Sequence, residues 1–197
     1  MQRTWALYIE QLSACLRAVC FTDGNGQPLD TDAAFSTWAN WTAELGHRRR
    51  SIYLIGNGAS ASMASHFAAD LAKNAHLHSQ VFHDPALLTA VSNDLGFERV
   101  FAEPLRRRAE EGDMLVAISS SGKSPNILAA IDVARDHRMT IVTLSSFAAD
   151  NPLRRRGDLN LFVASDTYGA AESTHASALH WWMDLVRLQR NPTSDQP

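Results

Sequence analysis

MLVAI at residues 114–118 is followed directly by SSSGKS at residues 119–124 and then by Pro125. Five consecutive apolar residues bounded by small polar ones predict a buried strand. Pro125 favours the first turn of a helix, which we expect to run from about Pro125 to His137. The serine-rich segment is therefore the loop between a strand and the helix that follows it.

The same unit of strand, polar loop and helix recurs along the chain. SIYLI (51–55) precedes GNGASAS (56–62) and a helix that ends near Leu71, and TIVTL (140–144) precedes SSFAAD (145–150). Further short strands are predicted at 80–83 and 159–163, before a last helix at 169–189. This alternation predicts an α/β fold, a three-layer αβα sandwich around a central parallel sheet, with ligands at the carboxyl ends of the strands.

Two helices are expected ahead of this sandwich. Apolar residues recur at helical spacing from Trp5 to Val19 and from Phe35 to Leu45, and FTDGNGQPLD (21–30) separates them. We therefore expect a single domain over residues 1–197, with an N-terminal helical pair within residues 1–46 and a mobile tail at residues 191–197.

Composition and charge exclude several classes of protein. The chain has 197 residues, of which 45% are hydrophobic and 20% charged, as in ordinary globular proteins. Its net charge of -3 gives no reason to expect a nucleic-acid or membrane partner. No apolar run approaches the ~20 residues that span a bilayer, and Glu10 and Arg17 interrupt any apolar signal region. We expect a cytoplasmic protein.

The serine-rich loop predicts an anion site. Four hydroxyls and Gly122 lie between a strand and a helix N-terminus, where free N–H groups and the helix dipole favour phosphate. The spacing is not that of a nucleoside triphosphate loop, because Ala117 stands where that loop has a glycine. The alternative is that the serines only cap the helix, for which one or two would suffice.

A second loop of this type, Gly56-Asn57-Gly58-Ala59-Ser60, follows the strand at 51–55. The two loops can converge on one ligand, and a phosphorylated sugar would fill the gap between them. A dinucleotide is disfavoured, because position 61 is Ala61 and the segment is not a GxGxxG motif followed by an acidic residue about twenty positions on.

Together these motifs resemble a known family. The segments GNGASAS (56–62), HFAADL (66–71) and AISSSGKSPN (117–126), joined by ALLTAVSNDLGFERVFAEPL (86–105), resemble the sugar isomerase (SIS) domain. In particular they are similar to the phosphoheptose isomerase family, which interconverts sedoheptulose 7-phosphate and an aldose heptose 7-phosphate. The serine loop is shared by SIS domains in general. Asn93-Asp94 and the histidine-bearing helix near the end of the chain are more specific to the phosphoheptose isomerase family. The resemblance covers nearly the whole chain.

The resemblance implies a role for each matching residue. A phosphorylated seven-carbon sugar would be held through its phosphate by Ser119, Ser121 and Ser124, with Ser120 also touching the sugar. Further substrate contacts would come from Asn57, Ser60, Asp94 and Glu172. Proton transfer would belong to Asp70 and His180. Asp70 replaces a glutamate of the family, Glu172 replaces a metal-associated glutamine, and an aspartate expected near Gly169 is absent.

The chemistry is consistent with these roles. Aldose–ketose isomerisation through an enediol needs one base and one acid, and a carboxylate facing a histidine supplies both. His66 and Asp70 are about 40° apart around their helix, and Glu172 and His180 about 80° around theirs. These four residues would suit zinc. Taken alone, His66 and Asp70 could equally be a solvated helical pair.

The resemblance also bears on assembly. Five tryptophans, Trp5, Trp38, Trp41, Trp181 and Trp182, are more than one modest sheet readily covers, so some apolar faces should meet another subunit. The family forms homotetramers with active sites near subunit boundaries, and we expect one here. Related SIS proteins without turnover provide the alternative function, a regulator that binds a phosphosugar or a protein partner.

Overall fold

The computed structural model describes residues 4–190, so the tail predicted at residues 191–197 lies outside the described part of the chain. The helices are α1 (Trp5–Arg17), α2 (Thr31–Arg48), α3 (Ala59–Ala75), α4 (Pro85–Leu95), α5 (Ala102–Arg108), α6 (Pro125–Asp136) and α7 (Tyr168–Arg190). The strands are β1 (Cys20–Asp23), β2 (Pro28–Leu29), β3 (Ser51–Gly56), β4 (His78–Gln80), β5 (Met114–Ser119), β6 (Thr140–Ser146) and β7 (Leu159–Val163). Two short 3-10 turns, η1 (Phe97–Arg99) and η2 (Pro152–Arg155), complete the described elements.

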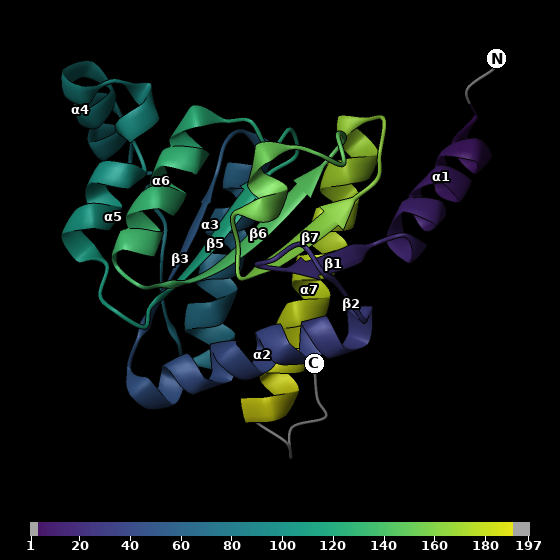
Figure 1. Cartoon of the computed structure of the whole chain (residues 1–197), viewed down its shortest axis with the longest axis horizontal. Coiled ribbons are helices and arrows are strands. Elements are labelled where there is room, and N and C mark those ends of the chain that lie inside the picture. The colour runs from purple at the N-terminus through teal and green to yellow at the C-terminus, as the bar shows by residue number, and fades with distance from the viewer. Residues whose placement is uncertain (1–3, 191–197) are drawn as a thin grey trace.

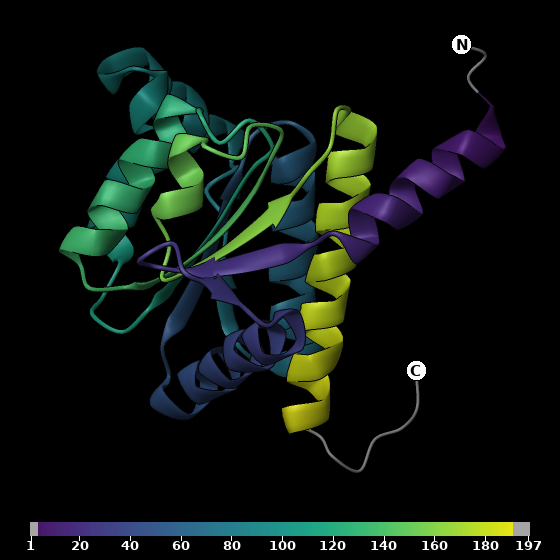
Figure 2. The same cartoon turned by 45° about the vertical axis from the view of Figure 1, so that its right-hand side comes forward.

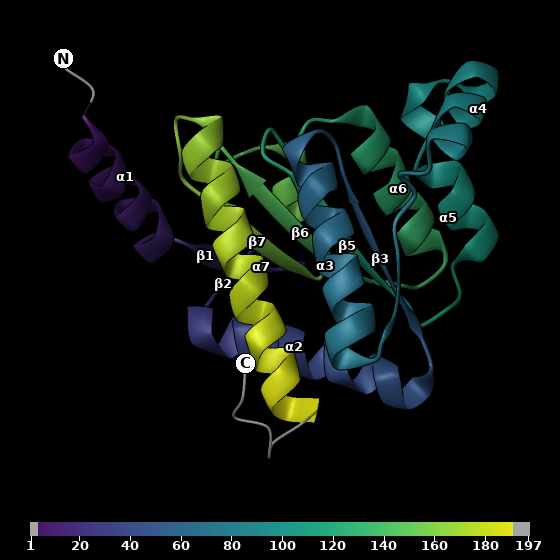
Figure 3. The same cartoon turned by 180° about the vertical axis from the view of Figure 1, so that it is seen from behind.

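The sheet has the strand order β2-β1-β7-β6-β5-β3-β4 (Figure 1). The strands from β7 to β4 are parallel, which confirms the predicted sheet. One core cluster packs the sheet against α2, α3 and α7, and a second packs its other face against α5 and α6. From behind, α3 and α7 run side by side over the sheet (Figure 3). The three-layer αβα sandwich is therefore confirmed.

The segment FTDGNGQPLD forms a β-hairpin, whereas its sequence pattern predicts only a break between two helices. Asp23 ends β1, and its carboxylate accepts hydrogen bonds from the backbone N–H of Asn25 at 2.9 Å and of Gln27 at 2.8 Å. Gly26 has a φ of 80°, which glycine adopts without strain. β1 pairs antiparallel with both β2 and β7, so the sheet is mixed at this edge.

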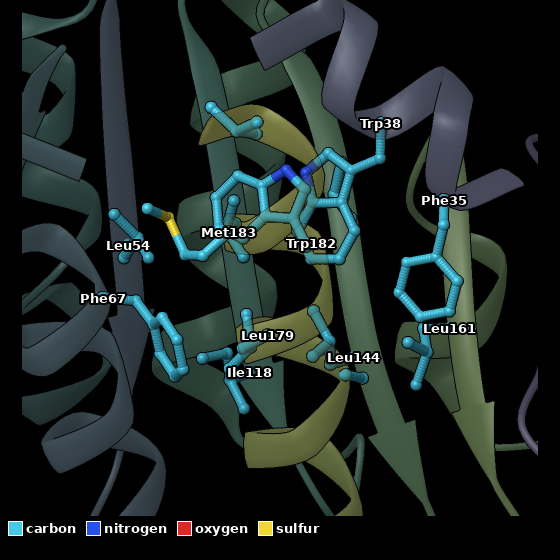
Figure 4. Packing of buried hydrophobic residues seen from close by; sticks show 14 of the residues in the cluster. Phe35, Trp38, Leu54, Phe67, Ile118, Leu144, Leu161, Leu179, Trp182 and Met183 are labelled. Atoms are coloured by element: carbon cyan, nitrogen blue, oxygen red, sulfur yellow. The ribbon is translucent and has the colours of Figure 1, made fainter. Parts of the chain in front are cut away.

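The N-terminal helices lie where they were predicted, but each packs against α7. α2 crosses beneath the sheet, while α1 extends away from the body of the molecule (Figure 2). Trp38 of α2 and Trp182 of α7 stack with ring centroids 4.2 Å apart and are fully buried (Figure 4). The chain's own core therefore fully covers two of the five tryptophans. Trp5 and Trp181 remain 73% and 47% exposed.

None of the helices within residues 4–190 combines the length and the apolar composition that crossing a bilayer requires. The predicted strand at 80–83 is displaced, because β4 ends at Gln80.

Candidate functional site

A polar cavity of about 150 Å³ lies at the carboxyl ends of β3 and β5. The two loops that the sequence analysis expected to converge both line it. Its lining consists of Asn57, Ser60, Ile118, Ser119, Ser120, Ser121, Ser124, Tyr168 and Glu172. Most of the predicted substrate contacts are thus brought together, and Tyr168 is an additional member. Its signal in the sequence was only its place at the start of the last helix.

The serine hydroxyls of this cavity do more than cap a helix. Ser124 directly precedes α6, yet its side chain makes no capping hydrogen bond and lies 3.2 Å from the hydroxyl of Ser119. The hydroxyl of Ser121 accepts a hydrogen bond from the N–H of Lys123 at 3.3 Å. The Ser120 hydroxyl is buried and finds no partner within residues 4–190. The capping alternative does not account for this arrangement.

A neighbouring segment holds the serine loop in shape. Gly122 has a φ of 63°, and a Cβ atom there would overlap the side chain of Asn151. Asn151 is buried, and its amide donates to the carbonyl of Ala148 at 2.8 Å and to the Ser145 hydroxyl at 3.2 Å. The N–H of Leu153 donates to the carbonyl of Gly122 at 3.1 Å. Asn151 is a long-range contact that the sequence pattern does not reveal.

The loop after β3 is tied to α6 by a pair of amides. The Asn57 amide nitrogen donates to Asn126 Oδ1 at 3.0 Å, and the Asn126 amide nitrogen donates back to Asn57 Oδ1 at 2.9 Å. Asn126 is 2% exposed, so this reciprocal pair is shielded from water. It fixes the separation between the two halves of the cavity.

His83 forms a hydrogen bond with the last residue of β3. Its Nε2–H donates to the carbonyl of Gly56 at 3.3 Å, and its Nδ1 accepts from the Ser65 hydroxyl, 3.0 Å away. Burial lowers the pKa of His83 below its ordinary value, and the hydrogen bond to Gly56 acts in the opposite direction. A neutral His83 therefore orients the backbone that leads into Asn57.

The predicted proton-transfer residues form a second cluster on the outer surface of α3 and α7. His66 Nε2 lies 3.4 Å from Asp70 Oδ2, which confirms that these two residues share a helix face. The ring centroids of His66 and His180 are 5.6 Å apart, and Phe67 packs edge-on against His180 at 4.8 Å. The Asn74 amide donates to Asp70 Oδ1 at 3.3 Å. Asp70 and His180 thus lie on adjacent helices, and both adjoin His66.

Within one chain this surface cluster does not line the cavity. At ~1.5 Å per residue, Asp70 lies about 15 Å along α3 from Ser60, and His180 about 12 Å along α7 from Glu172. Asp94, a predicted sugar contact, is exposed on α4, where its carboxylate accepts from the Asn93 amide at 2.8 Å. The predicted site residues therefore form two groups, plus an isolated Asp94.

The proposed zinc ligands are divided in the same way. Glu172 lines the cavity, whereas His66, Asp70 and His180 belong to the surface cluster. In the described part of the chain, no three His, Cys, Asp or Glu side chains are grouped so that they could hold a metal ion. The donors of a single chain therefore do not fit zinc, and its binding stays a prediction.

The fold and the polar cavity at its strand ends are those expected of a sugar isomerase (SIS) domain. Sequence comparison agrees. The family model described as SIS domain matches residues 31–146, and the chain belongs to that family. Within it, the chain belongs to the phosphoheptose isomerase family. It is 36% identical over 190 residues to the phosphoheptose isomerase of Solidesulfovibrio magneticus, covering 93% of this chain and 88% of that protein. It is 32% identical over 162 residues to the enzyme of Dechloromonas aromatica, covering 78% and 81%.

Solved structures share the fold. A phosphoheptose isomerase from Francisella tularensis superposes with a TM-score of 0.79 at 24% identity, covering 92% of this chain and 95% of that one. The Vibrio vulnificus NanR protein, complexed with ManNAc-6P, superposes with a TM-score of 0.61 at 21% identity, covering 93% and 60%.

Proposed function

We propose that this protein is an intramolecular oxidoreductase that interconverts sedoheptulose 7-phosphate and an aldose heptose 7-phosphate. The family relatives named phosphoheptose isomerase support this assignment over nearly the whole chain. The single observation that carries it is the Ser120 hydroxyl, which is buried in the lining of a polar cavity without a partner among the described residues.

The serine cavity suits the phosphate of such a sugar. A buried hydroxyl left unpaired costs about 1–3 kcal/mol, so a ligand that pairs with Ser120 gains that free energy. Ser119, Ser121 and Ser124 supply three more hydroxyls, and the N-terminus of α6 supplies a positive dipole end. A dianionic phosphate would accept hydrogen bonds from all of them.

Asp70 and His180 are the proposed acid–base pair. Starting from the ketose, the Asp70 carboxylate would remove a proton from C1 while protonated His180 donates one to the carbonyl oxygen at C2, which forms the enediol. Neutral His180 would then take the proton from the oxygen on C1 as Asp70 returns its proton to C2, which forms the aldose and restores both groups. Each step is a proton transfer between a substrate atom and a side chain, as general acid–base catalysis requires.

Within one chain, Asp70 and His180 lie apart from the serine cavity that would hold the phosphate. We propose a homotetramer in which the α3–α7 surface of one subunit faces the serine cavity of a neighbour. The proposal is supported by large apolar side chains that are exposed in the described part of the chain. They are Trp5, Leu7 and Ile9 of α1 and Trp181 and Leu188 of α7. Location in the cytoplasm stays a prediction.

The assembly is tested by light scattering together with activity. Four chains of 21.7 kDa give about 87 kDa, and we expect that mass at all concentrations at which the protein is active. Dilution below the dissociation constant should abolish activity, because each cavity would lose the acid–base pair of its neighbour. An active species near 22 kDa would contradict both the tetramer and the shared site.

The activity is tested by NMR. Incubation of the protein with sedoheptulose 7-phosphate is expected to produce an aldose signal, and in D₂O the exchanged carbon should carry deuterium because the proton passes through a side chain. Ser124→Ala serves as a matched variant that should bind and convert the sugar less well. Binding without product would instead favour a non-catalytic phosphosugar-binding regulator of the same family.

A further inference from the structure

Tyr168 lines two hollows of the molecular surface. It is the first residue of α7 and is 61% exposed despite its large ring. One hollow is the serine cavity. The other has a volume of about 450 Å³ and is lined by Phe147, Ser165, Asp166, Thr167 and again Tyr168. Of the described residues that line these two hollows, Tyr168 is the one they share.

Phe147 packs against the Tyr168 ring. The two rings meet edge to face, with centroids 4.8 Å apart and planes at 86°, an arrangement that aromatic pairs favour. Phe147 itself has a φ of 62°, in the left-handed region that glycine adopts freely and bulky residues avoid. Phe147 lines the larger hollow beside Tyr168, and a strained residue at such a position points to a functional requirement. The requirement that the geometry suggests is support of Tyr168.

The size of the serine cavity shows why the position of the Tyr168 ring matters. Whole-ligand pockets usually measure ~300–1,000 Å³, so a cavity of about 150 Å³ accommodates the phosphate end and leaves the carbon chain at its mouth. Tyr168 is the aromatic member of the lining, and an aromatic face packs well against the C–H groups of a sugar. The carbon chain of a bound sugar phosphate would therefore leave the cavity along the Tyr168 ring.

We propose that Tyr168, supported by Phe147, is a partition that determines which sugar phosphates fit. It separates the serine cavity from the larger hollow, admits an unbranched polyol chain and excludes sugars with a bulky substituent such as an N-acetyl group. The inference rests on the proposed function, because it takes the ligand to be a sugar phosphate. Without the ring, the two hollows would join and the excluded substituent would have room.

Calorimetric titration of the 197-residue chain with three probes tests the partition. The probes are inorganic phosphate, sedoheptulose 7-phosphate and N-acetylmannosamine 6-phosphate. In Tyr168→Ala, the affinity for inorganic phosphate should stay within about twofold, while the preference for the unbranched over the N-acetylated sugar falls about tenfold or more, the scale on which pocket shape discriminates. Phe147→Gly should lower the same preference to a smaller extent, because the ring of Tyr168 loses its support.

Controls separate the partition from the fold and from the phosphate site. Tyr168→Phe keeps the ring and should keep the sugar preference of the unmodified chain, and Phe147→Gly should still fold, because glycine accepts the positive φ. An unchanged sugar preference in Tyr168→Ala would overturn the partition, as would loss of its inorganic phosphate binding. If the unmodified chain binds neither phosphate nor either sugar, the proposed function itself fails and the partition with it.

Discussion

Asp70→Asn is expected to lower turnover of sedoheptulose 7-phosphate about a hundredfold or more, because the amide cannot accept the proton from the substrate carbon. His180→Gln should cause a loss of similar size, since it removes the group that exchanges protons with the two oxygens. Both substitutions conserve size on a surface that lies outside the core, so the thermal stability should change little. The measurement is kcat at saturating substrate, with KM determined separately.

A matched control lies one helical turn beyond His180. Asp184 is an exposed carboxylate of α7 with no assigned role, and Asp184→Asn should retain full activity. Full activity in Asp70→Asn would contradict its role as the base. Glu172 would then be the better candidate, because its side chain already lines the serine cavity of the same chain.

Local pattern was sufficient to predict the layers of this fold. MLVAI and SSSGKS correspond to β5 and the loop after it, and Pro125 is the first residue of α6. Buried parallel strands read as continuous apolar runs, and Pro favours the first turn of a helix, so each boundary has a local cause. The convergence of the two loops also followed, because parallel strands place their carboxyl ends at one edge.

Features that depend on distant residues were not predictable in this way. The β1–β2 hairpin is part of the sheet only because β1 pairs with β7, some 140 residues later in the chain. The stacking of Trp38 on Trp182 likewise joins two helices far apart in the sequence, so the sequence alone does not say which tryptophans the core covers. Asn151 and Tyr168 shape the cavity through folded neighbours that no local pattern specifies.

The grouping of the candidate site residues was likewise not predictable from local sequence pattern. A family resemblance can identify Asp70 and Ser121 as members of one site, but it does not say whether one chain brings them together. Helix geometry answers this question. Asp70 and Ser60 are ten residues apart on α3, which places them about 15 Å apart along the helix. The site residues of this chain are therefore best understood as two halves, one at the sheet edge and one on the α3–α7 surface.

His175 makes folding stability depend on pH. Its ring is fully buried on α7, its Nε2–H donates to the carbonyl of Ser145 at 3.2 Å, and its Nδ1 has no partner among the described residues. Burial lowers the pKa of His175 to about 4, against an opposing effect of the Ser145 hydrogen bond. The folded chain therefore keeps this ring neutral at pH values where the unfolded chain, with a pKa near 6.5, is protonated.

We expect the stability that depends on a neutral His175 to be fully present above pH 6.5 and to be lost as the pH falls toward 4, because only the unfolded chain gains a proton in that window. The shift corresponds to about 3 kcal/mol, most of it lost by pH 4.5. Urea unfolding at pH 7 and pH 4.5 measures it. His175→Gln should be less stable at pH 7 but show a smaller difference between the two pH values, whereas His47→Gln, which removes an exposed histidine, should match the unmodified chain. An equal pH dependence in His175→Gln and the unmodified chain would show that other groups cause the acid sensitivity.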